Sequence, residues 1–104
     1  AWHAHKVEHK FVGCLVGAVK VGAVHIEAGC DWENPPLGLP TQTWVLSATQ
    51  PGILHIPAGW ANGWMSLTDD ALLAVYSTST LEESMEDDYR YPAKWWNCWE
   101  VERR

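Results

Sequence analysis

Residues 11–26 read FVGCLVGAVKVGAVHI, and this stretch decides the fold class. Valine and small residues dominate it, and Gly17 divides it into two runs, 11–16 and 18–26. Short runs rich in β-branched residues and separated by glycine are typical of β-strands. We therefore expect either a hairpin or two consecutive strands here.

The chain beyond residue 26 continues as short strands separated by turns. We expect strands at 43–48, 53–56, 64–67 and 71–78, a loop at 29–40, and turns at 49–52 and 57–59, where proline and glycine gather. Thr68, Asp69 and Asp70 favour a hairpin between the last two strands. A helical turn is expected only at 81–87, since no longer segment has a helical period. Strands at this spacing predict an all-β sandwich or barrel.

The N-terminal segment Trp2-His3-Ala4-His5-Lys6 carries the first candidate functional residues. Side chains alternate along a strand, so His3 and His5 are expected on the same face. Such a pair can bind a metal ion or carry protons. Lys10 has the opposite parity in an unbroken strand, so a turn or bulge before it is needed to bring its side chain to that face.

Composition narrows the class of protein. A chain of 104 residues fits one domain, and its eight tryptophans exceed what a small core needs, which favours some of them in a ligand cleft or a subunit contact. A net charge of −6 argues against nucleic acid or an anionic membrane as a partner, and no apolar run approaches a membrane span. The three cysteines lack paired spacing, and we see no signal peptide, so a cytoplasmic location is expected.

The order His3-x-His5, Gly17 and then Pro57-x-Gly59 resembles the two motifs of the cupin superfamily. The resemblance implies a double-stranded β-helix, or jelly-roll barrel, as a single domain over residues 1–104. Lys10 stands where the motif has a metal-binding Glu, and Asn62 stands where it has its last His. An ammonium group has no lone pair to donate to a metal ion, so we expect no metal. Cupins have strands before His-x-His, and this chain lacks them or takes them from a second subunit, which predicts a homodimer.

Within that superfamily, residues 11–26, 40–48 and 54–64 resemble the dTDP-4-dehydrorhamnose 3,5-epimerases, and His3-Ala4-His5-Lys6 is similar to the related dTDP-sugar 3,4-ketoisomerases. The resemblance implies a reaction without metal or cofactor, in which a proton is removed next to the ketone of a nucleotide-linked 4-keto-6-deoxy sugar. His3 would be the base, His5 a second proton carrier, and Lys10 the cation that stabilises the oxyanion. The residues expected to bind the nucleotide sugar are Trp44, His55, Asn62 and Tyr76.

The sequence departs from the epimerases after Tyr76, where Thr80, Leu81 and Glu82 occupy the region of the family's catalytic tyrosine. This departure keeps three alternatives open: a sugar or nucleotide-sugar binder without catalysis, a metal-dependent cupin enzyme, and a structural dimer module without a ligand.

Overall fold

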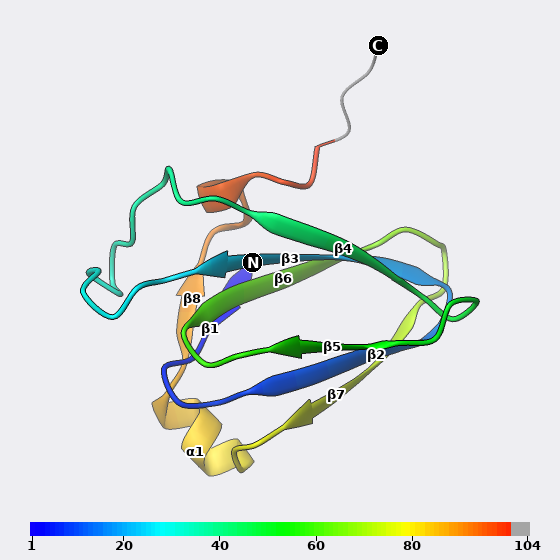
Figure 1. Ribbon diagram of the computed structural model, residues 1–104, viewed down its shortest axis with the longest axis horizontal. Helices are drawn as coiled ribbons and strands as arrows, with labels where there is room; N and C mark the ends of the chain where they lie inside the picture. Colours follow the sequence, from blue (N-terminus) through cyan, green and yellow to red (C-terminus); the bar gives the residue numbers. More distant parts are fainter. Residues whose placement is uncertain (101–104) are drawn as a thin grey trace.

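A computed structural model describes residues 1–100 and arranges them in two antiparallel sheets (Figure 1). The elements are β1 (Trp2–Ala4), β2 (Lys10–Val16), β3 (Ala18–His25), β4 (Gln42–Ser47), β5 (Ile53–Ile56), β6 (Trp60–Ser66), β7 (Leu72–Ser77), α1 (Leu81–Glu86), β8 (Tyr89–Tyr91) and the 3-10 helix η1 (Ala93–Trp96). One sheet has the order β4-β3-β6-β1-β8, and the other has the order β5-β2-β7. The all-β fold class is therefore confirmed.

The chain passes from one sheet to the other at two corners, at Gly17 and at residues 67–71, and the second corner corrects one expectation. β2 and β3 are consecutive strands in different sheets rather than a hairpin. The hairpin expected around residues 68–70 is wrong for the same reason, because β6 and β7 also belong to different sheets. The Thr68 hydroxyl donates to the carbonyl of Asp70 at 2.7 Å and accepts from the backbone N–H of Ala18 at 3.2 Å, so the two corners are bonded to each other.

Replacing Gly17 with Ala is expected to destabilise the fold by about 2 kcal/mol, because Gly17 has a φ of 70° and a left-handed conformation disfavours a side chain. An added Cβ would also lie 2.2 Å from the Asp70 carbonyl oxygen and 2.2 Å from the Thr68 hydroxyl oxygen. Urea unfolding measures the loss. Gly38→Ala is the matched control, since no atom lies within 4 Å of its added Cβ, and an equal loss there would contradict the explanation.

Alternating side chains fill the space between the sheets. Val12 and Ile56 from the three-stranded sheet pack against Val19 and Val21 from β3, and all four are buried. On each of these strands, every second residue counted from the buried valine or isoleucine also faces the interior. The polar side chains described below follow the same alternation.

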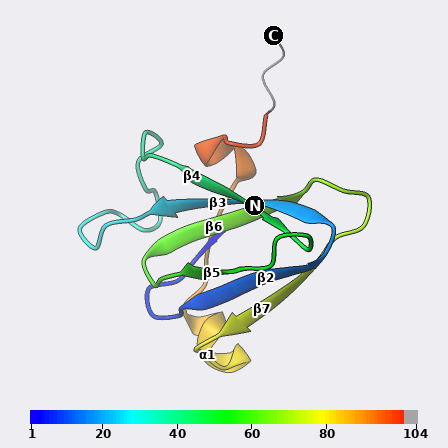
Figure 2. The same ribbon diagram turned by 45° about the vertical axis from the view of Figure 1, so that its right-hand side comes forward.

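The opposite face of the five-stranded sheet is covered by the loop at 29–40 and by the C-terminal segment, which lies beside that sheet and away from β7 (Figures 1 and 2). Trp2 and Trp96 are fully buried there. The indole N–H groups of Trp95 and Trp96 donate to the carbonyls of Pro35 and Pro36 at 3.0 and 2.9 Å. Several tryptophans thus hold a loop onto the sheet, which accounts for part of the surplus.

The helical turn expected at 81–87 is present as α1, and one strand, β6, is longer than expected. α1 begins with a capping box, in which the Thr80 hydroxyl accepts from the N–H of Glu83 and the Glu83 carboxylate accepts from the N–H of Thr80. β6 begins at Trp60, directly after the turn at Gly59, and so is longer than its expected range. Within residues 1–100 we find no helix with the length and apolar character that a membrane crossing requires.

Candidate functional site

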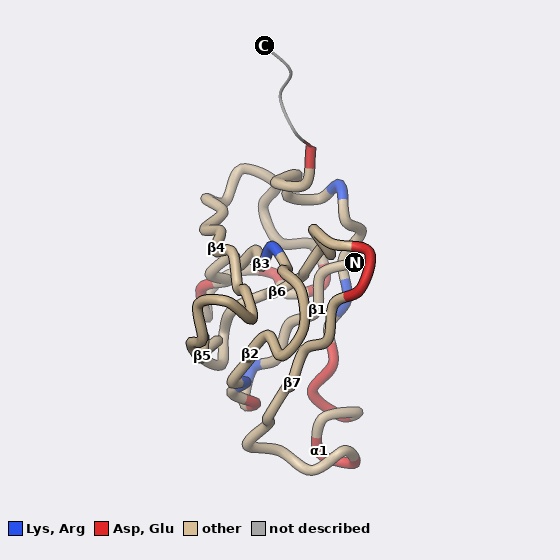
Figure 3. The backbone as a smooth tube through the Cα atoms, turned by 90° about the vertical axis from the view of Figure 1, so that its right-hand side faces the viewer, with Lys and Arg blue, Asp and Glu red and all other residues tan. Residues whose placement is uncertain are grey.

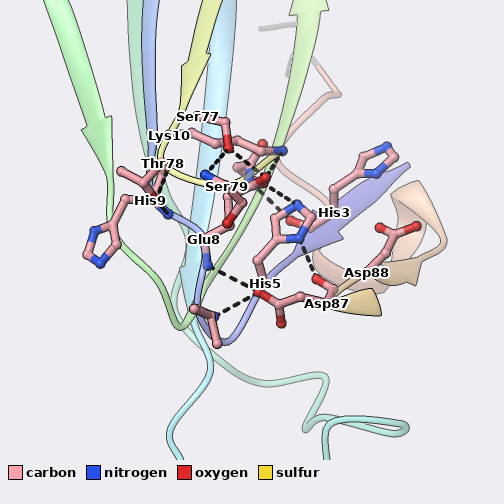
Figure 4. A network of polar contacts seen from close by, with 12 residues as sticks. His3, His5, Glu8, His9, Lys10, Ser77, Thr78, Ser79, Asp87 and Asp88 are labelled. Atoms are coloured by element: carbon pink, nitrogen blue, oxygen red, sulfur yellow. Dashed lines mark hydrogen bonds and ion pairs between the residues drawn. The ribbon is translucent and has the colours of Figure 1, made fainter. Parts of the chain in front are cut away.

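A buried carboxylate, Glu8, stands at the centre of the candidate site (Figure 4). Its residue is only 3% exposed. Oε1 accepts a hydrogen bond from the Ser77 hydroxyl at 2.7 Å, and Oε2 lies 3.0 Å from His5 Nε2 and 3.9 Å from Lys10 Nζ. Oε2 accepts no hydrogen bond within residues 1–100, and its contacts are the ion pairs with His5 and Lys10. The spacing of the cupin motif predicts Lys10 as a site residue but does not predict Glu8.

His5 is held from both sides and lies outside the strand that carries His3. β1 ends at Ala4, so the expectation that both imidazoles share one face of a strand is wrong. The His5 ring is buried, with Nδ1 2.5 Å from the Asp87 carbonyl oxygen and Nε2 beside Glu8. Both neighbours of the ring are acceptors. His5 therefore braces Glu8 and has no free nitrogen for a ligand.

Asp87, at the end of α1, explains why the chain turns after β1. Its carboxylate accepts the backbone N–H groups of Lys6, Val7 and Glu8 at 2.7, 2.8 and 3.1 Å. Burial would raise the pKa of this carboxyl, but the three N–H donors outweigh burial and lower it. The resulting turn brings Lys10 to the inner face despite its parity.

Replacing Asp87 with Asn is expected to destabilise the protein by about 2 kcal/mol at pH 7, because the amide cannot accept all three N–H bonds and lacks the charge that strengthens them. The pKa of Asp87 is lowered in the folded state, so its stabilisation is present above the ordinary value of 3.8 and is lost as the pH falls through the folded value. The difference between wild type and variant should therefore shrink in urea titrations at pH 3. A constant difference across this range would contradict the assignment.

His3 lies half-buried on the inner face of β1, between β6 and β8. Burial lowers its pKa below 6.5, and the charges of Lys10 and Arg90 lower it further. The ring is therefore neutral near pH 7, as a general base must be. Arg90 is its register neighbour on β8 and also pairs with Asp88 at 2.9 Å.

Lys10 is the cation of the cluster. Its side chain is mostly buried, and burial lowers its pKa, whereas Glu8 and Asp88 act in the opposite direction. Its charge reaches His3, whose pKa it lowers. The predicted cation is therefore close enough to the predicted base to lower its pKa, while the direct contact of the ammonium is with Glu8.

Asn62 is buried beside His3 and is 1% exposed. Its amide N–H donates to the His3 carbonyl at 3.1 Å, while Oδ1 has no hydrogen-bond partner among the described residues. A buried amide oxygen without a partner is costly, which makes this atom a candidate acceptor for a ligand hydroxyl.

A cavity of about 220 Å³ opens between the two sheets next to this cluster. Its lining residues come from both sheets: Ala23, Gln42, Trp44, His55, Ile56, Pro57 and Trp60. Ile56 is the register partner of Lys10, and Ala23 is the register partner of Asn62. The cavity therefore lies one strand away from the buried polar cluster, and His3, Glu8, Lys10 and Asn62 are not among its lining residues. Trp60 and Gln42 also line a second hollow of about 280 Å³, which includes Glu27.

The structure does not bring two of the predicted binding residues to that cluster. The His55 ring stacks on Phe11 with centroids 4.7 Å apart, on the outer face of the three-stranded sheet, although the residue forms part of the cavity wall. His55 was expected to bind the nucleotide sugar, but its ring lies outside the space between the sheets, because Leu54 and Ile56 are the residues of β5 that face inward. Tyr76 pairs with Phe11, lies on the same outer face and is 68% exposed.

No three His, Cys, Asp or Glu side chains within residues 1–100 converge as a metal ion would require. His5 and Glu8 are neighbours, but the third group beside Glu8 is the Lys10 ammonium, which cannot be a ligand. The donor set around Glu8 therefore does not fit a metal ion.

Comparison of the chain with protein-family models, with curated proteins and with solved structures found no match in any of the three.

Proposed function

We propose that the chain is a cupin-type jelly roll that binds a nucleotide-linked 4-keto-6-deoxy sugar and moves a proton beside its ketone without a metal ion. The observation that carries this proposal is geometric: His3 is half-buried on the inner face of β1 beside the buried Asn62, and the register neighbours of Asn62 and Lys10 line a cavity between the sheets. A base and a fixed cation are the two groups that enolisation of a ketone needs.

The strand neighbours support a jelly roll, which closes eight strands into two sheets. If β1 to β7 are taken as the second to eighth strands of such a roll, the orders β4-β3-β6-β1 and β5-β2-β7 are those of its two sheets. The first strand of the roll would then lie beside β7. β8 is an addition at the other sheet's edge.

The geometry favours ketoisomerisation over epimerisation. His3 would remove the proton from the carbon next to the ketone, the C–H electron pair would form an enediolate, and the Lys10 charge would stabilise its oxygen. The proton on the His3 ring would exchange with solvent, and His3 would then deliver a solvent-derived proton to the former ketone carbon on the same face, while the hydroxyl proton moves to the other oxygen. Epimerisation needs a proton donor on the opposite face of the sugar, and neither His5, with both nitrogens engaged, nor Tyr76, on the outer face, is available for that role.

Incubation with dTDP-4-keto-6-deoxyglucose in heavy water, followed by NMR, tests the reaction. We expect one deuterium at the former ketone carbon, together with a shift of the carbonyl to the neighbouring carbon. Label with inverted configuration at one or two carbons would indicate an epimerase instead. Absence of label, with the sugar bound, would overturn catalysis and leave a binder.

A sugar binder without catalysis is the second candidate, and the cavity itself favours it. Trp44 and Trp60 line the space between the sheets, and aromatic faces with a nearby amide such as Gln42 suit a sugar ring. If the protein only binds the sugar, the same compound should quench its tryptophan fluorescence but should take up no deuterium. Either function agrees with a cytoplasmic protein, because nucleotide sugars are cytoplasmic metabolites and Cys14, Cys30 and Cys98 are free thiols.

A further inference from the structure

Two histidines outside the candidate site, His9 and His55, bring their ring nitrogens into contact. His9 Nδ1 lies 3.1 Å from His55 Nε2, and the planes of the two rings are inclined by only 22°. His9 comes just before β2 and His55 lies in β5, so residues 46 positions apart supply the pair. In Figure 4 the His9 ring points away from Glu8 and His5. The pair is therefore a second imidazole cluster, separate from the polar cluster around Glu8.

Strand register places the two rings together and orients them. Phe11 is the register partner of His55, so His9, two residues earlier, is the diagonal neighbour of His55. The Phe11 ring stacks on the His55 ring with centroids 4.7 Å apart and planes inclined by 8°. The His9 N–H donates to the Thr78 hydroxyl at 3.0 Å, and the Thr78 N–H donates to the His9 carbonyl at 3.1 Å. The fold thus holds both imidazoles in place.

The distance between the two nitrogens matches that between two ligands of one metal ion. Imidazole nitrogens bind Zn²⁺ at about 2.0–2.1 Å, so two of them at a near-tetrahedral angle lie about 3.1–3.4 Å apart. Without an ion, one ring donates a proton to the other, and the pair makes one neutral hydrogen bond. With an ion, each ring carries its proton on the far nitrogen and gives a lone pair to the metal. His55 is exposed and His9 half-buried, so side-chain rotation can turn both lone pairs toward one point.

The charge around the pair favours a cation. β5 contains no charged residue and is tan along its length in Figure 3. The ammonium of Lys10, the residue after His9, lies on the inner side of the sheet, 3.9 Å from the Glu8 carboxylate. The net charge of −6 attracts dications to the protein as a whole. The residues that share the outer face of the sheet with His55 are uncharged: Phe11, Gly13, Ile53, Ala74 and Tyr76.

We propose that His9 and His55 form a binding site for Zn²⁺ or a similar transition-metal dication, with water in the remaining positions. Neutral imidazole is a preferred ligand of such ions. A resident ion needs three or more protein ligands, whereas an ion held by two exchanges with the solution and keeps positions open for a further ligand. The site is independent of the proposed reaction, which uses His3 and Lys10 and needs no metal.

A zinc titration at pH 7, followed by ¹⁵N NMR of the imidazoles, tests the site. Zn²⁺ should shift the signals of His9 Nδ1 and His55 Nε2 in parallel, while those of His25 keep their positions. His25 is also exposed, but its ring stacks on Trp60. The zinc-induced shifts should disappear at pH 5, because a protonated imidazole has no lone pair for the ion. A shift of one ring alone, or no shift with zinc in excess, would overturn the proposal.

Variants measure how much each imidazole contributes. His9→Asn and His55→Asn should each weaken zinc binding by at least about tenfold in isothermal titration calorimetry, because even loss of a group that orients a metal ligand costs about 10–100-fold. His25→Asn is the matched control and should bind zinc like the wild type. All three variants should keep the circular dichroism spectrum of the wild type, since none of the three side chains is fully buried. Equal zinc affinity of the wild type and either pair variant would assign the ion to other ligands and overturn the proposal.

Discussion

Replacing His3 with Asn is expected to slow deuterium incorporation into the keto sugar by about a thousandfold, the usual range for loss of a general base. Asparagine has a similar size and keeps the backbone contacts of β1, but its amide cannot accept a proton near pH 7. Binding of the nucleotide sugar, followed by tryptophan fluorescence, should change little. A rate that remains within a few fold of the wild type would rule out His3 as the base.

His9→Asn is the matched control for this experiment. His9 contacts His55 with ring nitrogens 3.1 Å apart, and its ring is not among the side chains that bind the Glu8 carboxylate. Its replacement should leave the exchange rate unchanged. In the wild type the rate should fall only below pH 6.5, because burial lowers the pKa of His3 and the base is protonated only in more acidic solution.

The strands could be read from the sequence because their signals are local. Runs that contain β-branched residues and are followed by Gly17, Pro51 or Gly59 carry their own boundaries, and the expected ranges at 11–26 and 53–56 agree with β2, β3 and β5 within a residue or two. The corners could not be read in this way. A turn such as 68–70 looks the same whether it joins neighbours in one sheet or passes from one sheet to the other, and that choice depends on contacts with Gly17 and Ala18, some fifty residues away.

The site was predictable only where its residues are close in the sequence. His3 and Lys10 were expected in the site because of the resemblance to the cupin motifs and the epimerase family. Glu8 accepts a hydrogen bond from Ser77, which is 69 residues away in the sequence. The turn that positions Glu8 depends on Asp87, which is 79 residues away. Alternation also predicted that His5 continues the strand of His3, whereas the strand ends at Ala4, because the Asp87 carboxylate binds the N–H groups of residues 6–8 in a turn.

Replacing Glu8 with Ala is expected to cost about 3 kcal/mol of folding free energy, the lower end of the range for removing one partner of a buried ion pair. The variant leaves the Lys10 ammonium and the His5 ring buried without the carboxylate, and it removes the acceptor of the Ser77 hydroxyl. Urea unfolding at pH 7 measures the loss. Glu8→Gln retains an acceptor for Ser77 and should lose about half as much, whereas the exposed Glu82→Ala should lose almost nothing.

The pH dependence of this loss separates the charge of Glu8 from its packing. Burial already lowers the pKa of Lys10 below 10.5, and Glu8 opposes that shift, so removal of Glu8 should lower the pKa further. Between the folded value and 10.5 the unfolded chain binds more protons at Lys10 than the folded chain, and stability therefore rises with pH in that window. The deficit of Glu8→Ala should shrink between pH 7 and pH 9.5, and that of Glu8→Gln should shrink likewise. A deficit that stays constant over this range would mean that Glu8 stabilises the fold by filling space rather than by compensating the buried lysine.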